Sequence, residues 1–513
     1  MDTLKCLIDS NVVIGLEDPR PVDTLFASFV RGCSAKGVRL FVDEAIYADV
    51  ARDRNATRRE ITESKLAKFE KLRAVPTGDD AALVARYGPI RSENDRSDVR
   101  LLAALDALAV DFLITQDGGL HRRAARVGLA GKVMTVGDAV RWLQQTFDPL
   151  QVELPFVAEK LAYEIDRRAP IFASLREDYD GFDLWFDRCA QEHRHCWVLE
   201  IGKEVAGLII RKEETHNQAG TQGLGPKILK LCTFKVRDEF RGEKFGEQLL
   251  KQALWFAQKN RFDLVYVTAF EKHEFLLELL RGYGFVATGK NVRGELVLEK
   301  TIRHGQLPTG AGALETHRAF YPRFSDGPEV RKFLVPIQPD YHSTLFPEIA
   351  FLAALPLLPS ELLVSRTRGW QGSTPGNTIR KVYLCHSRAK QLRPGDIVFF
   401  YMSKGAKYQF SQCVTSVGVV ETLSTAANYE ELSRATAKRS VFSATELHSL
   451  LAASDAPVRI IDFLLSAHLE PPVPLARLLE VGVCNQRPPQ SIAQLDAQQY
   501  LALRGLMNLG FAF

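Results

Sequence analysis

The sequence predicts an α/β protein of several domains, and three observations support this prediction. The 513 residues are too many for one hydrophobic core, and the usual domain size divides them into about three units. Residues 1–145 alternate short apolar runs with helical patterns, and so does a second stretch to about residue 303, which is typical of α/β sheets. From residue 346 onward, short strands and turns indicate a small β-barrel followed by helices.

Composition limits what the chain can do. Hydrophobic residues make up 46% of the chain and charged residues 25%, which is typical of a folded protein. A net charge of +4 permits a nucleic-acid partner without requiring one. The eight cysteines show no C-x-x-C pair and no zinc spacing, and the longest apolar run, Ile349 to Leu358, is too short for a bilayer. We therefore expect a cytoplasmic protein with reduced thiols and no membrane partner.

The first predicted domain, residues 1–147, is built on strands at Leu4–Ile8, Leu40–Val42 and Phe112–Thr115. Each strand is followed by a helical pattern, so a parallel sheet between helices is expected, an α/β/α fold. A short linker near residues 148–155 ends the domain.

Four aspartates in this domain are candidates for a metal site. Asp9 ends the first strand and Asp117 ends the last, so both project from the carboxyl edge of the sheet, where open α/β folds bind ligands. Asp49 lies on the helix after the second strand, and Asp98 borders the apolar face of a later helix. Converging carboxylates repel each other, and a hard cation such as Mg²⁺ or Mn²⁺ relieves this repulsion. The pattern predicts a metal-dependent site for phosphodiester cleavage.

The segment resembles the PIN-domain nucleases over about residues 1–145. The matching motifs are L-I-D-S-N, Y-A-D-V, D-V-R-L-L-A-A-L and I-T-Q-D-G, in the family's order. The resemblance assigns catalysis and metal binding to four residues: Asp9, Asp49, Asp98 and Asp117. It also places the hydroxyls of Ser10 and Thr115 where they support the metal shell.

Two of these assignments have competitors. The family more often has Glu at the second position, so Glu44 competes with Asp49; Glu44 stands at the first helical position, and Asp49 is preferred for that reason. Asp95 is the lesser competitor of Asp98. Alternatively, all these residues are capping and surface groups of an inactive fold.

The second predicted domain, residues 155–303, contains a strand, a turn and a helix that could hold a pyrophosphate. The expected strands are Cys196–Glu200, Val205–Arg211, Lys227–Val236, Leu264–Phe270 and Glu295–Thr301. The run V-R-D-E-F-R-G-E-K-F-G-E-Q-L-L, residues 236–250, leaves the third strand and opens a helix. Such a turn presents backbone N–H groups and a favourable dipole to an anion.

This run resembles motif A of the GNAT acyltransferases, whose loop holds acetyl-CoA and whose sheet is a mixed α/β sheet. The resemblance implies cofactor contacts at Phe234, Val236, Arg241, Gly242, Glu243, Lys244, Phe245 and Gly246. Lys244 departs from the pattern, which often has Gly there. Leu280 stands where many members have a Tyr general acid, and the strand before the loop has no Glu, so neither acid nor base is assigned.

Residues 304–345 are dense in Pro and Gly and predict a linker. Residues 346–513 form the last predicted domain. Its run K-V-Y-L-C-H-S-R-A-K-Q-L-R-P-G-D-I-V-F-F-Y and the later V-T-S-V-G-V-V-E resemble the PUA-like superfamily of ASCH and EVE domains over about residues 355–470. The resemblance implies a small barrel that binds RNA or modified bases. Stacking and phosphate contacts are expected from Arg366, Arg368, Trp370, Arg380 and Lys381.

Together these features suggest a bifunctional enzyme that acts on RNA, tRNA among the candidates, or on groups attached to it. The nuclease would use Mg²⁺ or Mn²⁺, and the central domain would transfer acetyl from acetyl-CoA to an amine. Both resemblances include bacterial toxins, so a toxin or stress-response role with a small antitoxin-like partner is a further hypothesis. The alternatives are an N-acetyltransferase whose flanking domains only recruit substrate, and a non-catalytic RNA-binding protein with degenerate sites.

Overall fold

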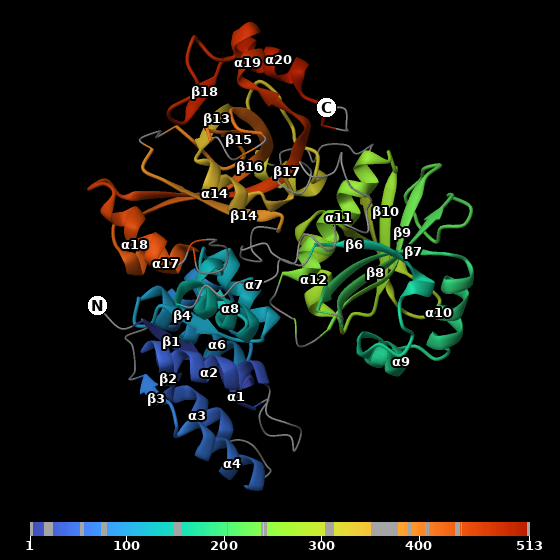
Figure 1. The fold of residues 1–513 in the computed structure, drawn as a ribbon. Coiled ribbons are helices and arrows are strands. Elements are labelled where there is room, and N and C mark those ends of the chain that lie inside the picture. Colours follow the sequence, from blue (N-terminus) through green and yellow to red (C-terminus); the bar gives the residue numbers. More distant parts are fainter. Residues whose placement is uncertain are drawn as a thin grey trace. The chain divides into compact units, whose positions relative to one another are not determined.

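The computed structural model describes fifteen stretches of the chain (Figure 1). They are residues 4–14, 24–51, 56–72, 79–147, 156–202, 204–237, 240, 244–302, 312–349, 378–387, 391–405, 408, 410–436, 442 and 444–509. The chain divides into two compact units, whereas domain size alone suggests three. Unit 1 is Met1–Leu150 with Thr425–Val458, and unit 2 is Gln151–Ser424 with Arg459–Phe513.

Unit 1 is built on a five-stranded sheet of order β3-β2-β1-β4-β5, in which all neighbours pair in parallel. The strands are β1 (Lys5–Ile8), β2 (Arg39–Asp43), β3 (Glu70–Leu72), β4 (Phe112–Ile114) and β5 (Val133–Met134). The helices are α1 (Ser10–Ile14), α2 (Thr24–Lys36), α3 (Glu44–Ala51), α4 (Ala56–Leu66), α5 (Asp80–Tyr87), α6 (Glu93–Asp106), α7 (Gly118–Arg126) and α8 (Val136–Phe147).

Side chains alternate across this sheet and bury both of its faces. On β1, Cys6 and Ile8 join a core with Phe29 of α2 and Trp142 of α8. Leu7, between them, joins a second core with helices α6 and α7. Period-two alternation therefore gives helices on both faces, and the expected parallel sheet between helices is confirmed.

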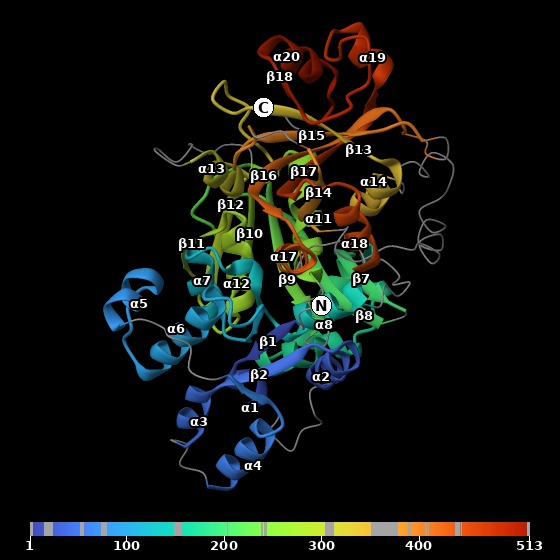
Figure 2. The same cartoon turned by 90° about the vertical axis from the view of Figure 1, so that its left-hand side faces the viewer.

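Two helices from far along the chain also belong to unit 1. They are α17 (Tyr429–Thr436) and α18 (Ala444–Ala452), and they contact the 3-10 helix Ala130–Lys132 and α8, respectively (Figures 1 and 2). The expectation that 346–513 forms a single domain was wrong for residues 425–458. Their amphipathic helices bury an apolar face, but a sequence pattern does not say against which core.

Unit 2 begins with a seven-stranded mixed sheet of order β11-β12-β10-β9-β8-β7-β6. Its strands are β6 (Ala158–Leu161), β7 (His195–Ile201), β8 (Glu204–Glu214), β9 (Ile228–Val236), β10 (Leu264–Ala269), β11 (Val286–Lys290) and β12 (Leu296–Thr301). Only β9 and β10 pair in parallel. The helices are α9 (Ala173–Asp178), α10 (Phe182–Gln191), α11 (Phe245–Lys259) and α12 (Glu274–Gly282). The mixed α/β sheet expected from the sequence is confirmed.

The rest of unit 2 contains a six-stranded sheet of order β14-β17-β16-β15-β13-β18. Its strands are β13 (Lys332–Ile337), β14 (Arg380–Cys385), β15 (Ile397–Met402), β16 (Cys413–Ala426), β17 (Val458–Pro474) and β18 (Ala493–Leu495). The helices are α13 (Ala313–Phe320), α14 (Pro339–Leu345), α19 (Leu475–Glu480) and α20 (Ala497–Leu506). Below, "the C-terminal region" means the described residues of unit 2 from 312 onward.

The expected linker at 304–345 needs correction, because residues 312–345 form α13, β13 and α14. The prolines that suggested a connector fit into regular elements. Pro336 lies in β13 beyond the pairing with β18, which ends at Leu334, and Pro339 opens α14 at a position that needs no N–H donor. Among the described residues, no helix has both the length and the apolar character to cross a membrane.

Candidate functional site

The first candidate site lies where β9 and β10 separate. The two strands pair from Ile228 to Leu231 and from Leu264 to Val267, and their pairing ends there. Strand β9 continues to Val236 but there pairs only with β8 on its other side. Main-chain groups of the second half of β9 therefore face a gap in the sheet. Phe234 and Val236, both expected to contact the cofactor, lie on this part of β9 and are half-buried.

Helix α11 begins close after this gap and supplies an anion-binding terminus. Lys244 caps it in the left-handed conformation, with φ of 59°. Phe245 and Gly246 follow as the first helical residues, and a Cβ on Gly246 would lie 3.2 Å from Leu279 of α12. The exposed N–H groups of a helix start favour a pyrophosphate, so these residues fit acetyl-CoA. Residues Arg241, Gly242 and Glu243 of the expected loop lie outside the described residues.

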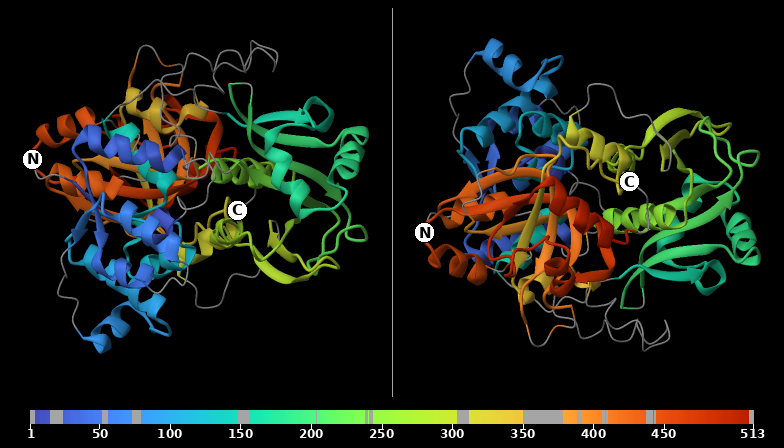
Figure 3. Two further views of the ribbon diagram at one scale, coloured as in Figure 1. Left: turned by 90° about the horizontal axis from the view of Figure 1, so that it is seen from below. Right: turned by 90° about the horizontal axis from the view of Figure 1, so that it is seen from above.

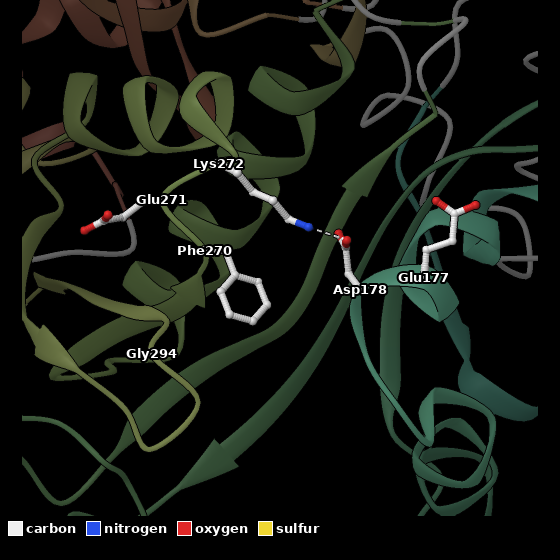
Figure 4. A pocket seen from close by; sticks show the side chains of 6 residues that line it. All are labelled: Glu177, Asp178, Phe270, Glu271, Lys272 and Gly294. Carbon is white, nitrogen blue, oxygen red and sulfur yellow. Dashed lines mark hydrogen bonds and ion pairs between the residues drawn. The ribbon is translucent and has the colours of Figure 1, made fainter.

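A cavity of about 420 Å³ opens at the carboxyl end of β10 (Figure 4). Three segments line it: the end of α9, the loop after β10 and the turn between β11 and β12. The lining residues are Glu177, Asp178, Phe270, Glu271, Lys272 and Gly294. The lining has three carboxylates and one ammonium group. Lys272 is ion-paired with Asp178, and Glu271 is paired with Lys290 at 3.1 Å. The cavity therefore favours a cationic guest.

Tyr179 packs against Phe270, which lines this cavity. Its ring stacks on Phe270 with a centroid distance of 5.5 Å, and its hydroxyl donates to Glu295 at 2.7 Å. Burial, followed by this bond to Glu295, raises the pKa of Tyr179, so the hydroxyl stays protonated at neutral pH. Sequence reasoning missed this cavity and its neighbours, because they come from three separate segments with no shared motif.

The structure explains why no general acid was found at the expected position. Leu280, which replaces the family's Tyr, has no exposed surface and packs in the core against α11. Tyr283, three residues later, is 1% exposed and packs against Tyr321 and Arg380.

The second candidate site is at the carboxyl edge of the sheet of unit 1. The strand order places β1 and β4 side by side where the chain reverses its direction of winding, which is the usual ligand position in open α/β sheets. Asp9 follows β1 and is 7% exposed. It accepts hydrogen bonds from Thr115 Oγ1 at 2.6 Å and from Ser10 Oγ at 3.3 Å, so both expected hydroxyls contact it.

Asp117 and Asp98 share this edge with Asp9. Asp117 caps α7, and its Oδ1 accepts the N–H groups of Gly119 and Leu120. The pKa of Asp98 is raised to about 7, mainly by burial and then by the charges of Asp117 and Asp9. Burial also raises the pKa of Asp9. Three of the four predicted carboxylates are therefore close enough to destabilise one another's charge.

Arginines surround these carboxylates. A cavity of about 390 Å³ is lined by Asn94, Asp95, Asp98, Asp117, Gly119, Arg122, Arg123 and Arg126. Arg123 pairs with Asp95 at 2.7 Å, so Asp95, the competitor of Asp98, is engaged in an ion pair. Arg122 and Arg126 are exposed on α7. The cavity combines carboxylates that could bind a cation with cations that could bind a phosphate.

The fourth predicted ligand remains a prediction. The side chain of Asp49 lies outside the described residues, although its backbone is part of α3. Its competitor Glu44 is exposed at the first position of the same helix. Among the described residues, no three His, Cys, Asp or Glu side chains are arranged to hold a metal ion. The described carboxylates alone are thus not a complete ligand set for Mg²⁺ or Mn²⁺, and we derive no reaction step through a metal.

Of the five residues expected to contact nucleic acid, three lie outside the described residues and two are described. Arg366, Arg368 and Trp370 lie outside the described residues. Lys381 is 1% exposed and donates to the backbone oxygen of Leu345 at 2.8 Å, so its ammonium lies inside unit 2 rather than on a surface. Burial lowers its pKa to about 7.

Arg380 is also turned inward. Its Nε lies 3.1 Å from Glu421, and its guanidinium lies 5.4 Å from the centre of the Tyr283 ring. These contacts are internal to unit 2, so phosphate binding by Arg380 remains a prediction without a described surface to support it.

The acetyltransferase (GNAT) family model matches residues 160–285. The match runs from β6 to the end of the segment before β11, and it includes β9, α11 and β10. Unit 2 therefore contains a GNAT acetyltransferase domain. No curated protein matches the chain.

Similar solved structures include an ASCH protein from Zymomonas mobilis, with 15% identity over 35% of this chain and 96% of that one, and a TM-score of 0.23. A putative GNAT acetyltransferase from Desulfovibrio desulfuricans has 15% identity over 28% of this chain and 98% of that one, with a TM-score of 0.23. A GNAT acetyltransferase from Elizabethkingia anophelis with acetyl-CoA bound has 15% identity over the same shares and a TM-score of 0.22. At TM-scores this low, these likenesses carry no argument about this chain.

Proposed function

We propose that unit 2 transfers an acetyl group from acetyl-CoA to an amine. The observation that carries the proposal is the separation of β9 from β10 beside the start of α11, within the segment that matches the acetyltransferase family. The part of β9 that no longer pairs with β10 suits an extended thioester chain, and the helix start suits its pyrophosphate.

The residues that would hold acetyl-CoA are those of β9 beyond Leu231 and the first residues of α11, with the ammonium of Lys244 close to the phosphates. When bound, acetyl-CoA supplies an acetyl group activated as a thioester. The protein's own contribution is to orient the thioester and to exclude water from it.

The acceptor would enter the cavity at the end of β10. An amine is cationic at neutral pH, and the carboxylates of Glu177, Asp178 and Glu271 attract that charge. Its nitrogen must lose a proton before its lone pair can attack a thioester, and a carboxylate of this cavity would accept that proton. The hydroxyl of Tyr179, held by Glu295, fixes the wall of the cavity.

Two measurements test this function. Acetyl-CoA should raise the melting temperature of the full chain, because a ligand that binds only the folded state stabilises it. Release of CoA thiol should then depend on an added amine, and a diamine should be used better than a monoamine of equal length. Asp178→Asn should weaken use of the diamine, whereas Glu480→Gln, an exposed carboxylate of α19, should not. No stabilisation by acetyl-CoA and no thiol release with any amine would refute the function.

A second function is proposed for unit 1: cleavage of RNA with the help of a divalent cation. The observation that favours it is the raised pKa of Asp98, caused by burial and then by Asp117 and Asp9. A protein rarely places three acidic groups where they destabilise one another unless a cation or a proton compensates them. The exposed Arg122 and Arg126 beside them suit a phosphate backbone.

Labelled RNA incubated with Mn²⁺ tests this second function. Wild type should cleave the RNA, and Asp9→Asn and Asp98→Asn should each abolish cleavage. The same preparations should keep their acetyl-CoA binding, which shows that the chain is folded. Cleavage that survives both substitutions would refute the assignment. An RNA role for the C-terminal region, a toxin role and an antitoxin-like partner remain hypotheses from the sequence.

A further inference from the structure

Helix α11 carries a row of four polar contacts to the C-terminal region. The residues are Glu247, Lys251, Trp255 and Lys259, and they recur at every fourth position, so they follow one face of the helix. The buried hydrophobic residues of α11, among them Leu249 and Leu254, pack in the core of the acetyltransferase domain. In Figure 3, α11 lies between the seven-stranded sheet and the C-terminal region.

The contacts are specific along most of the row. Lys251 forms an ion pair with Glu348, and both side chains are largely buried. Trp255 Nε1 donates a hydrogen bond to Tyr321 Oη at 3.0 Å, and Tyr321 Oη in turn donates one to the backbone oxygen of Leu465 at 2.9 Å. Lys259 pairs with Glu470 at 3.3 Å, but these two side chains are 71% and 51% exposed.

Glu247 is the residue of this row that lies nearest to the proposed cofactor. It is the third residue of α11 and is 9% exposed, and its Oε1 accepts the backbone N–H of Arg380 at 2.7 Å. A carboxylate in the first turn normally interacts with the N–H groups of its own helix start. Here this oxygen is bonded to β14 of the C-terminal region instead, which leaves the helix start for a ligand.

Arg380 also limits the electrostatic cost of a carboxylate beside a pyrophosphate. The neighbouring Tyr283 raises the pKa of Arg380, burial lowers it, and Glu421 and Glu247 raise it again. The guanidinium therefore stays charged near Glu247, and it offsets a negative charge that would otherwise repel the cofactor.

The contact between the two parts of unit 2 is also close at the backbone level. A Cβ on Gly284, at φ of +84°, would lie 2.4 Å from the backbone oxygen of Ala319 in α13. Tyr321, Ile379 and Leu464 of the C-terminal region belong to the same core as α11. The helix is thus held from both sides, and its start cannot shift without disturbing both.

We propose that the C-terminal region positions the start of α11 for acetyl-CoA, and that Glu247 and Lys251 are positioning residues that act through the helix. The proposal rests on the proposed acetyltransferase function. It predicts that the C-terminal region is needed for cofactor affinity.

The test compares variants of the full chain by calorimetric titration with CoA and by steady-state kinetics. Glu247→Ala removes the bond to Arg380, whereas Glu247→Gln keeps an oxygen that can accept it. Lys251→Met removes the buried ion pair. Lys259→Ala is the matched control, because it lies on the same face of the helix but about 21 Å from its start at Phe245, at about 1.5 Å per residue.

Glu247→Ala and Lys251→Met should raise the Kd for CoA and the KM for acetyl-CoA about fivefold to tenfold, while kcat at saturating acetyl-CoA stays within about twofold. Glu247→Gln should restore the affinity of wild type, and Lys259→Ala should match wild type. Where Lys251→Met fails to fold, Trp255→Phe, which keeps the ring and loses the bond to Tyr321, should raise the Kd in the same direction.

A merely structural role would give another pattern: a lower melting temperature with the Kd for CoA unchanged well below that temperature. That pattern in Glu247→Ala, or an equal loss of affinity in Lys259→Ala, would overturn the proposal. Failure of wild type to bind CoA would instead refute the proposed function itself, so the two failures are distinguishable.

Discussion

Neutralising Asp98 should make unit 1 more stable at pH 8. The carboxyl of Asp98 has a pKa raised from 3.8 to about 7, with burial as the largest cause, and Asp117 and Asp9 next. Because the folded-state pKa lies above that of the unfolded chain, the folded chain holds more protons between about pH 4 and pH 7. Its free energy of unfolding therefore falls as the pH rises through this range.

The size of the effect follows from the same shift. One pKa unit corresponds to about 1.4 kcal/mol, so the rise of the Asp98 pKa to about 7 would lower the free energy of unfolding by about 4 kcal/mol at pH 8. Asp98 is partly exposed, and solvent screens its interactions, so about 1 to 2 kcal/mol is the realistic share. Asp98→Asn should recover this amount at pH 8 and almost none of it at pH 4.

Hydrogen exchange of the full chain can measure this difference in unit 1 separately. Peptides from β1 and β4 lie in its core and exchange through its global opening, once the intrinsic effect of pH on exchange is removed. Asp95→Asn is the control, since Asp95 is held by Arg123 at 2.7 Å and its loss should destabilise unit 1 slightly at both pH values. Equal or weaker protection of Asp98→Asn at pH 8 would refute the reasoning.

Three other predictions concern single residues. Lys244→Gly should change the melting temperature by no more than about 2 °C. Glycine removes the backbone strain of a side chain at φ of 59°, and this gain offsets the greater conformational entropy of glycine in the unfolded chain. The variant should nevertheless bind CoA more weakly in titrations, because it lacks the cation. Arg434→Ala should lower the free energy of unfolding of unit 1 by about 1.5 to 3 kcal/mol in exchange experiments, since it breaks a bond of 2.8 Å to Asp111, whereas the exposed Arg477→Ala should not. Burial lowers the pKa of Lys300 to about 7, so the unfolded chain holds more protons than the folded chain between pH 7 and pH 10. The free energy of unfolding of unit 2, measured in urea titrations, should therefore rise across this range. Lys300→Met should remove that rise.

Much of the architecture could be predicted because local patterns decide it. The alternation of Cys6, Leu7 and Ile8 is enough to predict a strand buried on both faces, and the structure agrees. The strand, turn and helix around residue 236 were recognisable for the same reason, since they are consecutive in sequence. The helix expected within residues 236–250 is α11, which begins at Phe245.

The acceptor cavity could not be predicted, because its parts are distant in sequence. Asp178, Phe270 and Gly294 meet only through the pairing of the sheet, and none of them belongs to a motif. Lys381 is the opposite case, a residue that was predicted to contact nucleic acid but is buried. A lysine at the start of a strand suggests a surface charge, yet it is buried, with Glu348 raising its pKa against the effect of burial. Sequence spacing does not indicate that partner.

The division of the chain into units changes how the two proposed activities should be studied. Residues 425–458 belong to unit 1, and Arg434 within them bonds to Asp111, whose other oxygen accepts the N–H of Lys5, the first residue of β1. A fragment ending at residue 147 would therefore leave the largely buried carboxylate of Asp111, just before β4, without Arg434, at a cost of about 1 to 3 kcal/mol. Likewise, a fragment ending at residue 303 would lose Arg380, Glu348 and Tyr321 from the face of α11. Loss of activity in either fragment would reflect these missing contacts, so only substitutions in the full chain can assign each chemistry to its own residues.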